Sequence, residues 1–258
     1  MRDFPIVVLL ISLAALWAAT WVGASVLRRR RALDEQSRSH YASVAGAILT
    51  LLGLIIGFTF SMAVSRYDQR KTYEEAEANA IGTEFVRTDL LPGADGGRVR
   101  ILLTRYADLR IKDYQIHDAA EIQRLKEQTG ELEGQLWSAV RSSAAADPSP
   151  LTAMAVGGMN DVLNSHGYTQ AAWWNRIPRS AWWLMAAIAI VGCLLVGYGA
   201  QSFKAVAHFV WVLPLAISIA FFLIADIDSP RSGFVRLTPQ NLLDVARSMH
   251  ASVAAQPA

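Results

Sequence analysis

The sequence predicts an all-α membrane protein: four transmembrane helices, with a helical extramembrane domain inserted between the second and third spans. Apolar residues make up 53% of the 258 positions and charged residues only 18%, which is too apolar for a soluble domain of this length. Four stretches without a charge in their middle have the roughly 20 residues that cross a bilayer core. No alternation of apolar and polar residues indicates a strand.

The spans are expected at 5–27, 41–64, 181–201 and 206–225. The corresponding division of the chain is 1–64 for the first two helices, 65–179 for the extramembrane domain, 180–225 for the last two helices and 226–258 for a C-terminal tail. Ion-coupled transporters need ionisable groups at membrane depth, and the spans lack them, so this class is disfavoured.

The extramembrane domain starts as a continuation of the second span. No Gly or Pro follows Gly57 in the membrane-length segment that runs to Lys71, and the next cluster of turn residues lies at 92–97, so one helix is predicted from 41 to 91. Two apolar stripes with helical spacing follow, then a break at 147–150 and a last helix at 151–176. A rigid helix that joins the membrane to water suits a channel neck or a rod that transmits movement.

Small residues share one face of the second span. They are Gly46, Thr50, Gly53, Gly57, Ser61 and Ser65. One interpretation is close helix packing, since Gly53 and Gly57 form a small-xxx-small pair. The other is a face that lines a narrow pore, where the hydroxyls of Thr50 and Ser61 hydrate a passing ion.

Charged residues follow this face on the same helix. They include Arg66, Arg70, Lys71, Glu74, Glu75 and Glu77. Arg70 and Glu74 are four residues apart, a spacing that stiffens a solvated helix. In a ring of such helices, Arg66 and Arg70 would give the pore mouth a positive potential, and the glutamates would form an acidic collar below it.

Basic residues predict the orientation in a bacterial cytoplasmic (inner) membrane. The loop at 28–40 holds five arginines, and the loop around 202–205 holds Lys204. Short basic loops stay cytoplasmic, so domain 65–179 is expected on the periplasmic side. The net charge of +2 gives no reason to expect a nucleic-acid partner.

Several segments resemble a known family. GFTFSMAVSRY at 57–67 resembles the neck-to-cytosol segment of bestrophin anion channels. More widely, the chain looks like the bacterial bestrophin-like membrane proteins, in the segments EEAEANAIGTEF, LLTRYADLR, NRIP and DIDSPRSGFVRLTPQNLL. The resemblance implies a homo-pentamer that passes small inorganic ions, anions above all. It also implies a cytosolic helical domain, opposite to the orientation that the loops predict.

The resemblance also implies roles for particular residues. Phe58 takes the place of a constriction aromatic, and Leu54 and Thr50 would face the same axis one and two turns earlier. Asp226 and Asp228 take the place of an acidic calcium clasp after the last span. Calcium prefers six to eight oxygen ligands, so two aspartates are too few for a cage, and the alternative is that they cap backbone groups. No other cofactor is expected.

Two functions remain open at this point. One is an oligomeric ion channel whose second span lines the pore. The other is a membrane-anchored interaction or sensor protein whose helical domain binds a partner without conduction. An enzyme is disfavoured, because the five histidines lack metal-ligand spacing and no phosphate loop or nucleophile elbow occurs. The single Cys193 excludes a disulfide within the chain.

Overall fold

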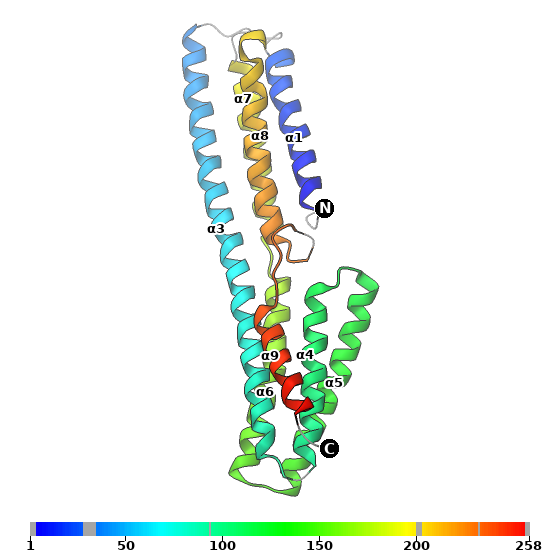
Figure 1. Cartoon of the computed structure of the whole chain (residues 1–258). Coiled ribbons are helices and arrows are strands. Elements are labelled where there is room, and N and C mark those ends of the chain that lie inside the picture. Colours follow the sequence, from blue (N-terminus) through cyan, green and yellow to red (C-terminus); the bar gives the residue numbers. More distant parts are fainter. Residues whose placement is uncertain (1–3, 28–34, 93, 200–202, 232, 256–258) are drawn as a thin grey trace. The chain divides into compact units, whose positions relative to one another are not determined.

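A computed structural model describes residues 4–27, 35–92, 94–199, 203–231 and 233–255. These residues form helices and connecting turns without any strand, which confirms the predicted all-α class (Figure 1). The chain divides into two compact units. Unit 1 comprises Met1–Tyr67 and Arg176–Arg236, and unit 2 comprises Asp68–Asn175 and Leu237–Ala258. The predicted basic residues at 28–31 lie outside the described residues.

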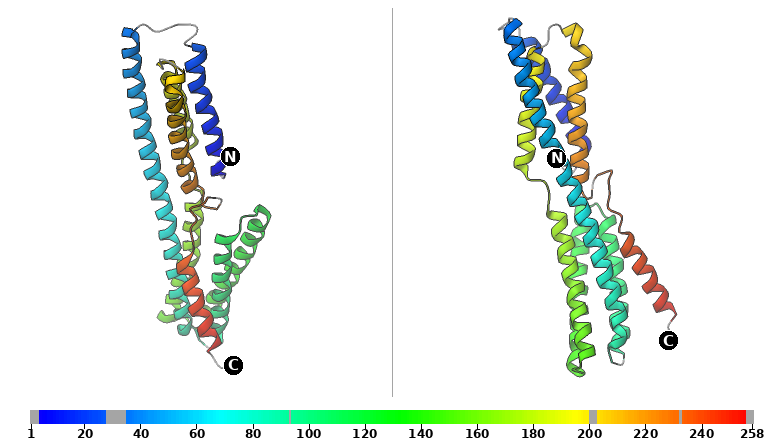
Figure 2. Two further views of the ribbon diagram at one scale, coloured as in Figure 1. Left: turned by 45° about the horizontal axis from the view of Figure 1, so that its top comes forward. Right: turned by 90° about the vertical axis from the view of Figure 1, so that its left-hand side faces the viewer.

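Unit 1 holds the membrane helices. It contains α1 (Pro5–Val22), the π-helix η1 (Gly23–Leu27), the first part of α3 (Glu35–Arg87), α7 (Arg179–Gly199) and α8 (Phe203–Asp228). Four helical stretches in the described residues are long and apolar enough to cross a membrane, in agreement with the predicted spans. Helix α1 packs against both α7 and α8 and lies between them in the right-hand view of Figure 2. Leu52, Met185 and Phe221 belong to the buried core that these helices share.

Two glycines let α1 and α7 approach closely. A Cβ atom added to Gly197 would overlap the backbone carbonyl of Thr20, and one added to Gly23 would overlap the carbonyl of Leu194. Both glycines are buried. Small residues commonly allow such backbone contact between membrane helices. Close helix packing was one interpretation of Gly53 and Gly57, and among the described residues of unit 1 such backbone contact between helices is found instead at Gly23 and Gly197.

Unit 2 is a helical bundle. It contains the rest of α3, the 3-10 helix η2 (Thr88–Leu90), α4 (Asp95–Gln115), α5 (Ala119–Ala146), α6 (Pro150–Trp174) and α9 (Gln240–Ala254). Asp118 accepts hydrogen bonds from two backbone N–H groups at the start of α5, and Ser149 forms a capping box before α6. The predicted turn at 92–97 is too long by three residues, because α4 already begins at Asp95.

The sequence analysis did not predict helix α9. Its buried residues Leu242, Ala246 and Met249 recur at helical spacing, a signal that is present in the sequence. The carboxylate of Glu74 accepts the backbone N–H of Leu242 at 2.9 Å and the side-chain amide of Asn241 at 2.7 Å. A negative charge at a helix N-terminus is stabilising, so Glu74 anchors the first turn of α9 to α3.

Candidate functional site

The predicted small-residue face of α3 is uncovered within the chain. Its residues are exposed: Gly46, Thr50, Gly53, Gly57, Ser61 and Ser65. A Cβ atom added to any of its three glycines would meet no heavy atom within 4 Å among the described residues. The opposite face of α3 is buried, with Leu52 and Ala63 in the core of unit 1. Close packing inside one chain therefore does not account for the small residues.

The predicted neck residues lie on this exposed side of α3. The side chains of Leu54 and Phe58 are 55% and 65% exposed. Thr50 is also exposed, and its hydroxyl donates a hydrogen bond to the carbonyl of Gly46 at 2.9 Å. The oxygen of that hydroxyl keeps lone pairs that can accept a further hydrogen bond. The three residues thus lie on one side of the helix, as the neck prediction requires.

The structure corrects the interpretation of Arg70 as part of a solvated charge pair. Its guanidinium is buried, and it donates to the carbonyl oxygens of Ala172 at 3.2 Å and Asn175 at 3.4 Å. These carbonyls lie at the C-terminal end of α6, where a cation is favourable. Glu74, its expected partner, contacts α9 instead. Arg66, another predicted mouth residue, is half-buried. Its Nη2 lies 3.5 Å from the sulfur of Met62.

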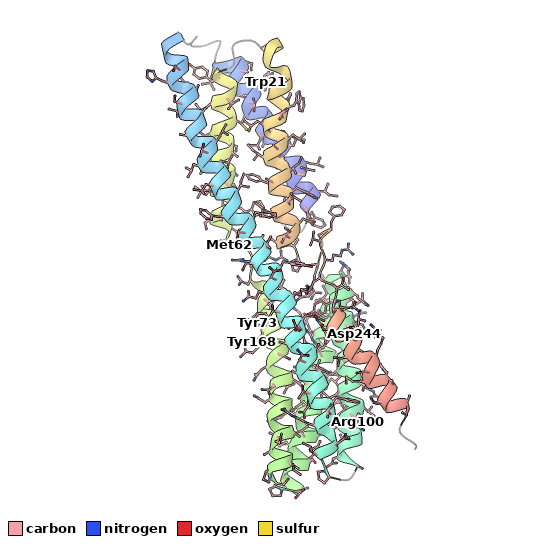
Figure 3. The ribbon with its side chains drawn as sticks, turned by 60° about the vertical axis from the view of Figure 1, so that its left-hand side comes forward. Trp21, Met62, Tyr73, Arg100, Tyr168 and Asp244 are labelled. Atoms are coloured by element: carbon pink, nitrogen blue, oxygen red, sulfur yellow. The ribbon has the colours of Figure 1, made fainter. Side chains whose placement is uncertain are left out.

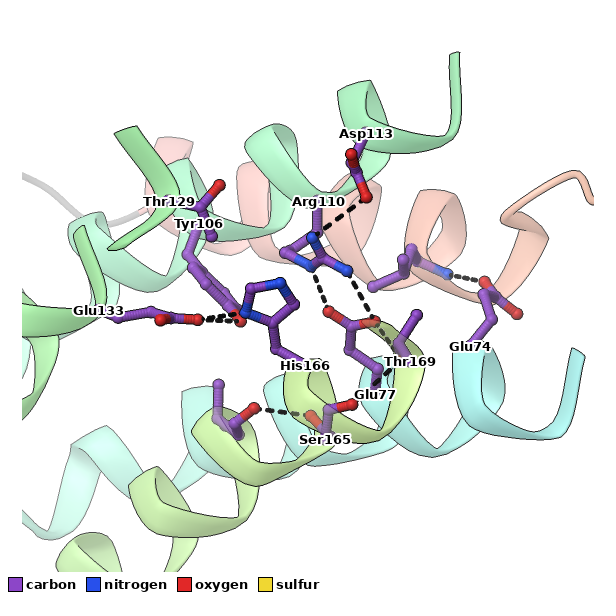
Figure 4. A network of polar contacts seen from close by, with 12 residues as sticks. Glu74, Glu77, Tyr106, Arg110, Asp113, Thr129, Glu133, Ser165, His166 and Thr169 are labelled. Carbon is purple, nitrogen blue, oxygen red and sulfur yellow. Dashed lines mark hydrogen bonds and ion pairs between the residues drawn. The ribbon is translucent and has the colours of Figure 1, made fainter. Parts of the chain in front are cut away.

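Glu77 belongs to a buried ion pair, which also corrects its assignment to an acidic collar. Arg110 of α4 donates from Nε and Nη2 to the two carboxylate oxygens of Glu77 (Figure 4). Thr169 of α6 donates to the same carboxylate at 2.9 Å, and Asp113 lies 3.5 Å from Arg110. Burial by itself lowers the pKa of Arg110, but the charge and hydrogen bonds of Glu77 outweigh it and raise that pKa. Arg110 therefore stays charged, and its contact with Glu77 and Thr169 joins α3, α4 and α6.

A second polar cluster adjoins this pair. Glu133 of α5 accepts a hydrogen bond from the hydroxyl of Tyr106 at 3.3 Å and lies 2.6 Å from Nδ1 of His166 on α6. Burial raises the pKa of Tyr106, which keeps its hydroxyl protonated as a donor. On the surface of the same unit, Tyr73 of α3 stacks on Tyr168 of α6 with ring centroids 6.0 Å apart (Figure 3). These contacts fix the bundle of unit 2.

Glu84 is a buried carboxyl group on α3 that has no hydrogen-bond partner among the described residues. It lies against Gly158 of α6, where a Cβ atom would overlap both Glu84 and Arg87. Burial raises the pKa of Glu84 from 4.5 to about 8, with Arg87 lowering it and Asp161 raising it by smaller amounts. The folded chain therefore holds this carboxyl group in its neutral form near pH 7.

The stability of the protein should consequently fall as pH rises. Between pH 4.5 and about 8 the folded chain keeps a proton on Glu84 that the unfolded chain has lost. The free energy of unfolding should thus decrease by up to about 1.4 kcal/mol per pH unit in this window. Glu84→Gln removes the effect, so this variant should have a higher Tm than the parent at pH 8 and a similar one near pH 5. Glu75→Gln, exposed on the same helix, is the control. An equal pH dependence of Tm in parent and Glu84→Gln would contradict the assignment.

The two aspartates of the predicted calcium clasp bind backbone groups. Asp226 accepts the N–H groups of Phe234 at 2.6 Å and Val235 at 2.9 Å, and Asp228 accepts the N–H group of Ile177 at 3.1 Å. Both carboxylates are buried. No group of three or more His, Cys, Asp or Glu residues that could hold a metal occurs in the described part of the chain. The arrangement favours the capping interpretation, and its donor set does not fit a calcium cage.

Comparison with known proteins agrees with this architecture. A family model of the bestrophin-like domain matches residues 10–242. The fold is similar to crystal structures of a bacterial bestrophin homologue from Klebsiella pneumoniae. One, of a single-substitution variant, has 12% sequence identity and a TM-score of 0.68 over 95% of this chain and 99% of that chain. Another has 14% identity and a TM-score of 0.65 over 98% and 99% of the two chains. No curated protein matches the chain.

Proposed function

Because the chain belongs to the bestrophin-like family, we propose that this integral membrane protein assembles as a homo-oligomer and conducts small ions through a pore lined by α3. The observation that carries the proposal is the uncovered small-residue face of this helix. Gly53 and Gly57 have no neighbour inside the described chain, although each costs helix stability relative to alanine. A ring of copies, five by resemblance to bestrophins, would turn these faces toward a common axis and use the space that the missing side chains leave.

Exposed residues at the same spacing of three or four also occur along the aqueous half of α3: Gln69, Thr72, Ala76, Asn79, Thr83 and Val86. The exposed carboxylates of Asp68 and Glu75 lie among them, three residues after Ser65 and Thr72, so this part of the helix also carries negative charge.

We assign the neck to Phe58 and Leu54, whose exposed apolar side chains would form its narrowest part. A hydrophobic constriction controls conduction through dewetting, and Thr50 would keep the level above it wetter. The preference for anions is proposed from the resemblance to bestrophins. The negative charges of Glu77 and Glu74 are offset by Arg110 and the N-terminus of α9, whereas Asp68 and Glu75 are exposed.

Ion flux into liposomes that contain the purified protein tests this function. Phe58→Ala should raise the flux several-fold, because it widens the apolar neck. Phe60→Ala is the matched control: Phe60 is also exposed on α3, but two residues further along the helix its side chain points nearly opposite to that of Phe58. An intact oligomer that passes no small ion, as the alternative of an interaction or sensor protein requires, would sink the proposal.

For the orientation we propose that unit 2 lies in the cytosol. Family membership supports the placement that the resemblance implies, and basic residues such as Arg176 and Arg179 flank the spans on the side of unit 2 as well. Single cysteines at Asp95 and Ser37, introduced after replacement of Cys193, should react differently with an impermeant thiol reagent. In intact cells the cysteine at 37 should be labelled and the one at 95 protected; the reverse pattern would contradict the cytosolic placement.

A further inference from the structure

Two cavities lie along α1 in unit 1, and Val7 lines both of them. The outer cavity has a volume of about 370 Å³, with Phe4, Phe234 and Arg236 in its lining. The inner cavity has a volume of about 290 Å³ and lies between α1, Ile190 of α7 and Phe221 of α8. The helix rises about 18 Å over the residues from 4 to 16 that border the two cavities. This length is close to the hydrocarbon depth of one leaflet, about 15 Å.

The inner cavity suits an acyl chain. All of its lining side chains are apolar except Ser12, and the hydroxyl of Ser12 already donates to the carbonyl of Leu9 at 3.1 Å. A cavity without free polar groups does not hold ordered water, whereas an apolar ligand can occupy it.

The outer cavity suits a phosphate group. Arg236 is exposed, and its Nε donates to the carbonyl of Gly233 at 3.1 Å, which holds the side chain at the loop that lines the cavity. A guanidinium group recognises phosphate through charge-assisted hydrogen bonds. Phe4 and Phe234 are 63% and 71% exposed at the same end, and aromatic rings are typical of the membrane interface. Along α1 the lining thus changes from one that contains a cation to one that is apolar except for Ser12, and the two cavities are together called the groove.

We propose that a phospholipid binds in this groove, with an acyl chain beside Ala15 and Phe221 and its phosphate on Arg236. A free phosphate ion would use the arginine alone and leave the inner cavity empty. A second copy of the chain would fill the apolar part with side chains and has no need of a phosphate contact. The lipid is the occupant that matches both ends, and the assignment does not depend on whether the protein conducts.

Native mass spectrometry of the full-length protein with phosphatidylglycerol tests the proposal, since one spectrum gives bound lipid and subunit number. Arg236→Gln should weaken lipid retention about tenfold, the worth of one charge-assisted hydrogen bond. Ala15→Leu should also reduce retention, because the larger side chain fills the inner cavity. The matched controls are Ala14→Leu, which is exposed next to the groove, and Arg247→Gln, whose arginine pairs with Asp244 in unit 2. Both controls should retain lipid.

Three results would overturn the lipid assignment. Equal retention by Ala15→Leu and Ala14→Leu would mean that no chain occupies the inner cavity. Loss of the oligomer in Ala15→Leu with lipid retention unchanged would show that a second copy covers the groove. Displacement of the lipid by inorganic phosphate at equal concentration would reduce the site to an anion contact at Arg236.

Discussion

Replacement of Arg110 with alanine is expected to lower the free energy of unfolding by about 3–5 kcal/mol. The substitution leaves the carboxylate of Glu77 buried without its cation, and Thr169 supplies only one neutral donor in its place. Because Glu77 is fully buried, its charge in the variant would have neither a cation nor bulk water around it. Chemical unfolding of the purified protein in detergent, followed by circular dichroism, measures the change.

Two further variants separate the ion pair from other effects. Arg105→Ala removes an exposed arginine from the same helix and should change stability by less than about 0.5 kcal/mol. The double variant Arg110→Met with Glu77→Gln removes both charges and should recover most of the loss, since no isolated charge remains buried. If Arg110→Ala costs no more than Arg105→Ala, the buried pair does not stabilise unit 2.

The second large effect is expected from Gly197→Ala, by about 3 kcal/mol. The added methyl group would overlap the backbone carbonyl of Thr20, and no side-chain rotation relieves a contact with backbone. Helices α1 and α7 would have to separate, with loss of packing around Leu16 and Cys193. The Tm of the detergent-solubilised protein should fall accordingly.

Gly199→Ala is the matched control for this substitution. Gly199 lies two residues further along α7 than Gly197. A Cβ atom added to it would meet no heavy atom within 4 Å among the described residues. Alanine also has the higher helix propensity, so this control should be neutral or slightly stabilising. Equal Tm values for Gly197→Ala and Gly199→Ala would show that the helix crossing is not tightly packed.

The sequence is most informative about individual helices. Hydropathy places the spans, and Asp118 and the Ser149–Pro150 pair mark the starts of α5 and α6 through local chemistry that any reader of the sequence can recognise. That the small residues of α3 share one side was predictable for the same reason, because a single helix determines which residues share a side, whereas the exposure of that side was not. Helix α9 was missed because the tail lacks a long apolar run, although its period was visible.

Partners that are distant in the sequence were not predictable. The spacing rule joins Arg70 to Glu74, whereas Arg70 contacts Ala172, Glu74 contacts Leu242 and Glu77 contacts Arg110. These contacts depend on how the helices pack against one another. No local pattern in the sequence determines that packing. The same holds for Gly23 and Gly197, whose role exists only at the crossing of α1 with α7.

The central claim is that several copies turn Gly53, Gly57 and Ser61 of α3 toward a shared aqueous axis. Electron cryomicroscopy of the protein in lipid nanodiscs tests it most directly. The claim predicts a ring of subunits in which these residues border a water-filled path that is narrowest at Phe58. A particle in which the same residues contact acyl chains or the packed helix of a neighbour, with no path along the axis, would contradict it.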